Sequence, residues 1–328
     1  MSDRFRAFRV SSDGRCFCGS TDSGIIRIWD AGDLSLIAAL DTGFPEGFHR
    51  LAIDTGNHLL FSGAWGEGLS CHNYRSGARL WHRSDLRGIQ SVEHSNGWPL
   101  SIHVAVDVLE TEQNLPDVFS GIAELDSRSG ETLWHAKDGL SVFLHPTEPL
   151  LVMEASQEPE WIRRRPWWMP RIFAWISGHG MPSSETGSDR SLAILDQSKE
   201  RCASLEMANF AILDVAFVGD LMALAEGEKG VRVIRRDGSV LAHHASAGRE
   251  SNFIQAGFDR STGTWVFLDQ WEEAFVIILD GATGRLLNEY RRASRGGIHL
   301  IGDGSRYVDD QGQVCRTSNG ELLAQLDM

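Results

Sequence analysis

Lysine is almost missing from this chain of 328 residues, whose 31 basic residues include only Lys137, Lys199 and Lys229. We interpret the preference for arginine as the bias of a GC-rich bacterial genome rather than a functional choice. Acidic residues number 45, so the net charge is −14. General nucleic-acid binding is therefore not expected, because most of the surface would repel phosphate groups. The charge suits a soluble protein or association with a basic partner.

Cysteine is also scarce, and its five copies are scattered: Cys16, Cys18, Cys71, Cys202 and Cys315. An odd, scattered set predicts reduced thiols in the cytoplasm rather than a disulfide scaffold. We expect Cys16 and Cys18, two apart on one strand, to be buried structural residues. No apolar stretch approaches the length of a membrane span. The first residues also lack the apolar region of a signal peptide, so a cytoplasmic location is expected.

Motifs of the common catalytic sites are missing as well. The sequence contains no H-E-x-x-H, paired C-x-x-C, Walker loop or G-x-S-x-G. The adjacent pair His243 and His244 would alternate faces on a strand, so it could not chelate one metal ion by itself. The sequence therefore predicts no metal site and no cofactor. It favours a protein that is not an enzyme, without deciding the matter.

What the chain does contain is a turn that recurs seven times, most copies following the pattern D-x-x-[ST]-G-x-x-L. The clearest copies begin at Asp126 and Asp280, and a third begins at Asn73. Looser copies begin at Asp30, Asp196, Arg236 and Thr317. The Asp or Asn can accept hydrogen bonds from the backbone two residues on, and Gly supplies a positive φ. Each copy lies between two short apolar runs, which predicts an antiparallel hairpin.

The repeat predicts a closed β architecture. Four short strands in each of seven units, roughly 47 residues apart, indicate an all-β fold: a seven-bladed β-propeller of four-stranded antiparallel blades. We expect a single domain over residues 1–328, with an insertion in blade 4. The units fall at 1–43, 44–88, 89–139, 140–209, 210–252, 253–296 and 297–328. Seven whole blades leave no strand to be exchanged where the ring closes.

The blade pattern carries a family resemblance. L-D-x-x-[ST]-G-x-x-L-W resembles the signature of quinoprotein-like propellers of the PQQ-repeat and YVTN types, and Ile28-Trp29-Asp30 resembles the end of a WD40 strand. The resemblance covers nearly the whole chain and implies the fold alone. Its superfamily includes scaffolds, lactonases, dehydrogenases and receptors. The chain lacks the Gly-His and Trp-Asp pairing of strong WD40 repeats, and contacts for a quinone cofactor cannot be assigned.

The repeat is interrupted in the fourth unit by an insertion at about 156–190. Its first half concentrates four Trp and four Arg: Trp161, Arg163, Arg164, Arg165, Trp167, Trp168, Arg171 and Trp175. Trp and Arg are enriched at binding hot spots, so we expect this segment to be the main contact with a partner protein. The alternative is a structural lid, in which arginine stems pack over tryptophan rings against the next blade. Contact with a membrane or nucleic acid is a further alternative.

A second candidate site follows from aligning the first strand of each unit. A large apolar residue followed by a more polar one recurs near its start, and the polar residues are Arg6, His49, Gln90, Ser141, Asp214, Gln255 and His299. Innermost strands line the channel of a propeller, so we expect these residues to meet in one central funnel. A carboxylate, two His and an Arg would suit acid–base chemistry or a small anionic ligand. The alternative is the ordinary polar lining of a wet channel.

Together these features predict a non-catalytic protein-interaction propeller. We expect a bacterial cytoplasmic scaffold, regulatory or immunity-type binding protein whose partner is another protein, with a basic partner fitting the charge best. Two alternatives remain open. One is a funnel-site enzyme of the lactonase-like hydrolase kind, and the other is a small-ligand-binding sensor.

Overall fold

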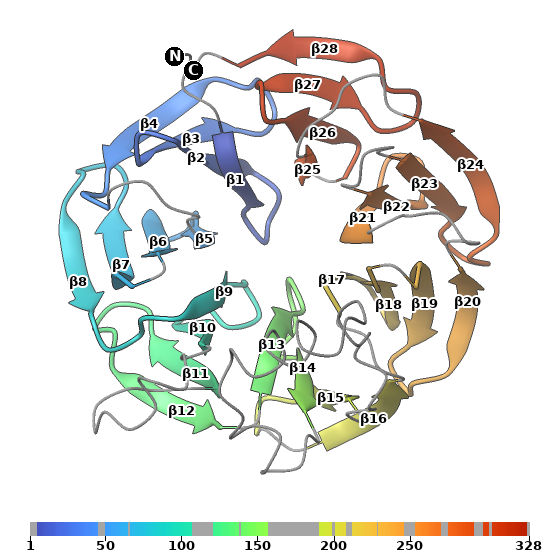
Figure 1. The fold of residues 1–328 in the computed structure, drawn as a ribbon, viewed down its shortest axis with the longest axis horizontal. Helices are drawn as coiled ribbons and strands as arrows, with labels where there is room; N and C mark the ends of the chain where they lie inside the picture. Colours follow the sequence, from blue (N-terminus) through green and yellow to red (C-terminus); the bar gives the residue numbers. More distant parts are fainter. Residues whose placement is uncertain are drawn as a thin grey trace, which may run out of the picture.

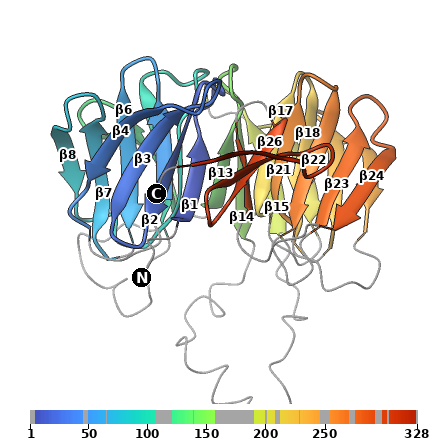
Figure 2. The same ribbon diagram turned by 90° about the horizontal axis from the view of Figure 1, so that it is seen from above.

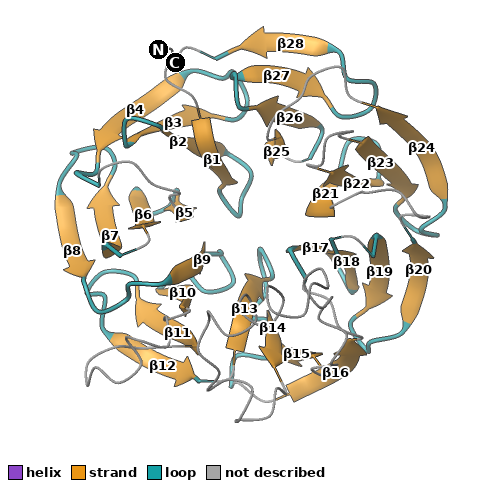
Figure 3. Ribbon diagram, in the orientation of Figure 1, coloured by secondary structure: helices purple, strands orange, loops and turns teal. Residues whose placement is uncertain are grey.

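A computed structural model of the chain describes residues 5–44, 50–64, 66–106, 121–137, 139–156, 190–198, 201–207, 212–227, 229–245, 253–269, 275–291, 298–301 and 304–326. Within these ranges the chain forms seven four-stranded antiparallel sheets in a ring (Figure 1). The same ranges include no helix (Figure 3), and so none that could cross a membrane. The predicted seven-bladed β-propeller is confirmed.

Each blade is built from four consecutive strands, numbered outward from the centre. The innermost strands are β1 (Phe5–Val10), β5 (Arg50–Asp54), β9 (Ile89–Glu93), β13 (Gly139–Leu144), β17 (Asp214–Val218), β21 (Phe253–Asp259) and β25 (Ile298–Ile301). The second strands are β2 (Cys16–Thr21), β6 (Leu59–Ala64), β10 (Ser101–Val106), β14 (Leu151–Ser156), β18 (Leu221–Ala225), β22 (Thr264–Asp269) and β26 (Arg306–Asp309). The third strands are β3 (Ile25–Asp30), β7 (Gly68–Asn73), β11 (Gly121–Asp126), β15 (Arg190–Leu195), β19 (Val231–Arg235), β23 (Phe275–Asp280) and β27 (Gln313–Arg316). The outermost strands are β4 (Leu36–Asp41), β8 (Arg79–Arg83), β12 (Thr132–Ala136), β16 (Arg201–Met207), β20 (Val240–His244), β24 (Leu286–Arg291) and β28 (Leu322–Gln325).

The recurring turn joins the third and outermost strands, as the sequence predicts. In blade 3 the carboxylate of Asp126 accepts hydrogen bonds from the backbone N–H groups of Arg128 (2.9 Å) and Ser129 (2.8 Å). Gly130 follows with a φ of 74° and donates its own N–H to the carbonyl of Asp126. A residue with a side chain would be strained at that φ, so the Asp and the Gly together fix the hairpin. We call the face of the ring that carries these turns the turn face; Figure 2 shows the strands running between it and the opposite face.

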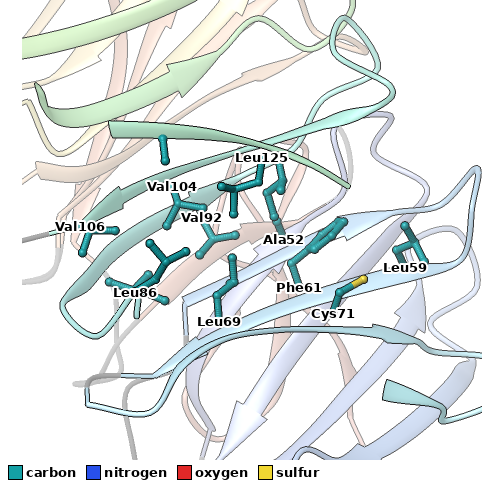
Figure 4. Close-up of a cluster of buried hydrophobic side chains, with 13 residues drawn as sticks. Ala52, Leu59, Phe61, Leu69, Cys71, Leu86, Val92, Val104, Val106 and Leu125 are labelled. Atoms are coloured by element: carbon teal, nitrogen blue, oxygen red, sulfur yellow. The ribbon is translucent and has the colours of Figure 1, made fainter. Parts of the chain in front are cut away.

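The core consists of seven apolar clusters, one between each pair of neighbouring blades. Figure 4 shows the cluster between blades 2 and 3, where Phe61 and Leu69 face Val92 and Val104. Side chains alternate across a strand, so each blade serves two clusters. Along β23, Ile277 and Leu279 pack toward blade 5 while Val276 and Ile278 pack toward blade 7. Strands buried on both faces explain the continuous apolar runs of the sequence.

The ring closes through side chains rather than through an exchanged strand. Every sheet contains only consecutive strands, so blade 7 meets blade 1 without sharing a strand with it. Trp29 of blade 1 is 1% exposed and stacks on Phe17 with ring centroids 5.1 Å apart. The same cluster contains Ile301 and Val308 of blade 7. This closure agrees with the seven whole blades that the sequence predicts.

A β-bulge recurs in the outermost strand of every blade. In each case one residue of that strand has no partner on the third strand, just after the turn. The bulged residues are Ile37, Leu80, Leu133, Cys202, Leu241, Leu287 and Leu323. An extra residue bends the strand and increases its twist. The exposed apolar side chains of these strands form what we call the rim: Leu36, Ile37, Leu80, Leu133, Val240, Leu286, Leu287, Leu322 and Leu323.

A second repeated feature lies where the third strand begins. In four blades a glycine with positive φ stands there: Gly24, Gly68, Gly121 and Gly230. At Gly68, Gly121 and Gly230 an added Cβ would meet the carbonyl oxygen of the last residue of the outermost strand, and at Gly24 it would meet that of Phe44, just beyond β4. A Cβ added to Gly230 would lie 2.0 Å from the carbonyl oxygen of His244, so no other residue fits without moving the backbone. The glycine therefore allows the close approach of two backbones at this end of the blade.

Candidate functional site

The Trp/Arg insertion lies outside the described residues. All eight of its predicted contact residues fall in the undescribed range 157–189, between the second and third strands of blade 4. The two strands that flank it are paired, with Ser156 opposite Arg190. The insertion therefore leaves blade 4 and returns to it at one pair of neighbouring residues. Its role as a partner contact stays a prediction.

The predicted funnel residues can be placed, with one exception. His49 lies outside the described residues. The other six line one cavity of about 620 Å³ at the opposite face, where the innermost strands begin: Arg6, Gln90, Ser141, Asp214, Gln255 and His299. The cavity has a size typical of small-molecule sites. Its use as a functional site stays a prediction.

The residues of this ring are not all equivalent in register. Arg6 and Gln90 are the bulged residues of β1 and β9, without partners on the second strand. In β13 and β21 the bulged positions are those of Leu140 and Ile254, so Ser141 and Gln255 stand one residue further along. The bulges explain why counting residues in the sequence does not give equivalent positions in each blade.

The channel narrows at a charged cluster that the sequence analysis missed. A second cavity, of about 330 Å³, lies toward the turn face, and the two cavities share Phe8, Arg9, Glu93, Asp214 and Gln255. We call Arg9, Glu93 and Asp214 the waist. The guanidinium of Arg9 in blade 1 donates to the carboxylate of Glu93 in blade 3, so the pair passes in front of blade 2. No local pattern indicates a contact between residues 84 positions apart.

Burial dominates the electrostatics of the waist. It raises the pKa of Asp214, against the opposing effects of Arg9 and two backbone N–H groups. Burial also raises the pKa of Glu93, and the charge of Asp214 adds to this rise, while Arg9 lowers it. Burial alone would lower the pKa of Arg9, but the two carboxylates outweigh it and the net direction is upward. The arrangement is a cation held between two carboxylates.

Polar side chains also join the innermost strands of blades 5, 6 and 7. Asp214 accepts the backbone N–H of Ala256 in the next blade at 3.0 Å and that of Val215 at 3.0 Å, one on each carboxylate oxygen. Gln255 likewise accepts the N–H of Leu300 at 2.8 Å, and its amide nitrogen lies 3.0 Å from Nδ1 of His299. These predicted funnel residues therefore hold neighbouring blades together.

Chemically, the waist concentrates charge, with one guanidinium between two carboxylates. The described residues contain no group of three His, Cys, Asp or Glu side chains placed to bind one. Four of the five cysteines are described, and all four are buried: Cys16, Cys18, Cys71 and Cys315. Burial raises the pKa of the Cys16 thiol to about 11, which makes it a poor nucleophile at neutral pH.

Comparisons with known proteins point to the fold. No protein-family model matches the chain, and no curated protein matches it. The chain is similar to the solved β-propeller domain of Cps50 (Swd1) from Myceliophteria thermophila, at 11% identity and a TM-score of 0.65, with 98% of this chain and 96% of that chain covered. It is similar to KlHsv2 with loop 6CD replaced by a Gly-Ser linker, at 11% identity and a TM-score of 0.65, with 100% and 98% covered. The computationally designed Ika8 protein is 15% identical with a TM-score of 0.60, and 99% and 87% are covered.

At these identities the likeness shows the β-propeller fold alone. It supports the WD40-like part of the sequence resemblance at the level of fold. The quinoprotein-type part stays a prediction.

Proposed function

We propose that this protein is a non-catalytic propeller that binds another protein. The observation that carries the proposal is the rim, where outermost strands in six of the seven blades expose large apolar side chains. Repeated exposure of Leu at matching positions, such as Leu80 at 49% and Leu133 at 56%, is typical of surfaces that a partner covers. The β-propeller fold is consistent with this role.

The finer features of the proposal rest on the sequence. The net charge of −14 favours a basic partner, and the free cysteines favour a reducing cytoplasm. We place the protein in a bacterium because of its low lysine content. A scaffold, regulatory or immunity-type binding protein fits these features. A hydrolase at the funnel is less well supported, because both oxygens of Asp214 already accept backbone hydrogen bonds.

The Trp/Arg insertion is the proposed main contact. We expect Trp167→Ala combined with Trp168→Ala to weaken binding of the partner by about 2 kcal/mol or more, because tryptophan dominates binding hot spots. The melting temperature should change little. The measurement is isothermal titration of the partner that the full chain recovers in stoichiometric amount from source cells, paired with a thermal melt.

The control for this pair is Ser183→Ala with Ser184→Ala, in the Gly/Ser/Pro-rich half of the same insertion. Its binding should equal that of the wild type. A fall in melting temperature without a specific loss of binding would show instead that the two tryptophans form a structural lid. Replacing residues 158–176 with a Gly-Ser linker tests the whole contact in the same assay.

A further inference from the structure

One arginine of the channel has no partner among the residues that the structure describes. Arg50 begins β5 and lines the cavity of about 620 Å³ at the opposite face. The two other arginines of that cavity are paired, Arg6 with Asp22 and Arg9 with Glu93. The side chain of Arg50 makes no hydrogen bond or ion pair with any residue that the structure describes. An unpaired cation therefore faces a cavity large enough for a small molecule.

Arg50 is exposed to the solvent of the channel. Partial desolvation by the channel wall lowers its pKa, and the positive charge of Arg9 lowers it further. A guanidinium nevertheless keeps its proton at neutral pH. Two positive groups thus act on each other in a partly enclosed space, where charges interact more strongly than in bulk water. An anion beside Arg50 would relieve this repulsion.

Hydrogen-bond donors line the cavity next to β5. Gln90 and Ser91, on the neighbouring innermost strand β9, both border the cavity. The hydroxyl of Ser91 is buried and has no hydrogen-bond partner among the described residues. A guanidinium with a neighbouring amide is a typical set of donors for a carboxylate or phosphate. The hydroxyl oxygen of Ser91 is closed to solvent, so the proposed donors are the side chains of Arg50 and Gln90.

Carboxylates elsewhere in the lining of the cavity limit how much negative charge the ligand can carry. Glu93 and Asp214 face Arg9 at the waist, which offsets part of their charge. Asp310 also lines the cavity, and its Oδ1 atom is buried without a described hydrogen-bond partner. A ligand with several negative groups would be repelled by Asp310. A molecule with one anionic end avoids that repulsion.

We propose that this cavity binds a small molecule with a single anionic end, a carboxylate or a phosphate, on the guanidinium of Arg50. The site is separate from the rim, because it lies inside the channel. It adds a ligand-binding function to a protein-binding one.

The experiment titrates the full chain with acetate and, separately, with inorganic phosphate, at constant ionic strength set with sodium chloride. We expect saturable binding of at least one probe, and the stronger response identifies the preferred anionic group. Arg50→Gln should weaken that binding about tenfold or more, since a hydrogen bond to a charged group contributes about 1.5–3 kcal/mol. Arg15→Gln, at an arginine side chain that is 82% exposed, serves as the matched control and should bind like the wild type.

A second variant keeps the test decisive if Arg50→Gln does not fold. Asp310→Asn removes a negative charge from the wall, and we expect it to tighten binding by about threefold or more. The proposal is overturned if neither probe binds the wild type saturably, or if both variants bind the probe as the wild type does.

Discussion

Trp29→Ala should lower the free energy of unfolding by about 3–5 kcal/mol, the cost typical of removing a fully buried tryptophan. Trp29 is packed by Phe5, Phe8 and Phe17 within the cluster that joins blade 1 to blade 7. Six junctions of the ring also have a covalent connection, whereas this one depends on side chains and a few hydrogen bonds. Removing the Trp29 side chain should therefore also loosen the junction between blades 1 and 7. Urea denaturation measures the fall in the free energy of unfolding. Amide hydrogen exchange in blades 1 and 7 measures how far the junction between them has loosened.

The matched control is Trp265→Ala. Trp265 is fully buried between blades 5 and 6, which the chain connects directly. Its loss should cost a similar free energy, because a similar apolar area is lost. Exchange in blades 1 and 7 should then remain slow in native conditions. If both variants speed exchange equally around the ring, the closure is no weaker than the other junctions.

Glu226→Gln should stabilise the protein at pH 8 by up to about 3 kcal/mol and change its stability little below pH 5. Glu226 follows β18 and is 1% exposed. Burial raises its pKa from 4.5 to about 7, although Arg232 opposes this rise with its Nε 3.1 Å from Oε1. The raised pKa means that the folded protein holds a proton which the unfolded chain releases near pH 4.5. Stability from this group is therefore present below pH 4.5 and is lost as the pH rises through 7.

The measurement is urea denaturation of both proteins from pH 4.5 to 8, with the difference between them plotted against pH. Subtracting the curves removes the titration of other groups. Glu321→Gln, at a glutamate side chain that is 55% exposed, is the control and should show no such slope. A constant difference between wild type and Glu226→Gln across this range would mean that Glu226 keeps an ordinary pKa in the folded protein.

The sequence predicted the blades because their turns are local. Asp126 accepts hydrogen bonds from the backbone N–H groups of Arg128, Ser129 and Gly130, so the hairpin is decided within five residues without help from distant ones. The glycine with positive φ at the start of the third strand is a second local signal of the blade repeat. Gly24, Gly121 and Gly230 each stand directly before or at the start of an apolar strand, and this repetition could have marked the blades as well.

The channel was harder to predict because its contacts are not local. Bulges at Arg6 and Gln90 shift the register in two blades, and no residue pattern announces them. The pair of Arg9 and Glu93 depends on the curvature of the ring, which brings the innermost strands of blades 1 and 3 within reach of each other in front of blade 2. No sequence pattern shows that Arg6 and Arg9 are paired while Arg50 has no partner among the described residues.

The repeated bulge in the outermost strands has a consequence for the behaviour of the protein in concentrated solution. Each blade ends in an open sheet edge, and an open edge with apolar side chains is a template for strands of other molecules, which leads to aggregation. A bulge at the same point in β4, β8, β12, β16, β20, β24 and β28 interrupts the straight row of backbone groups that a foreign strand would need. The rim can thus offer apolar side chains to a partner while its backbone resists the growth of fibrils.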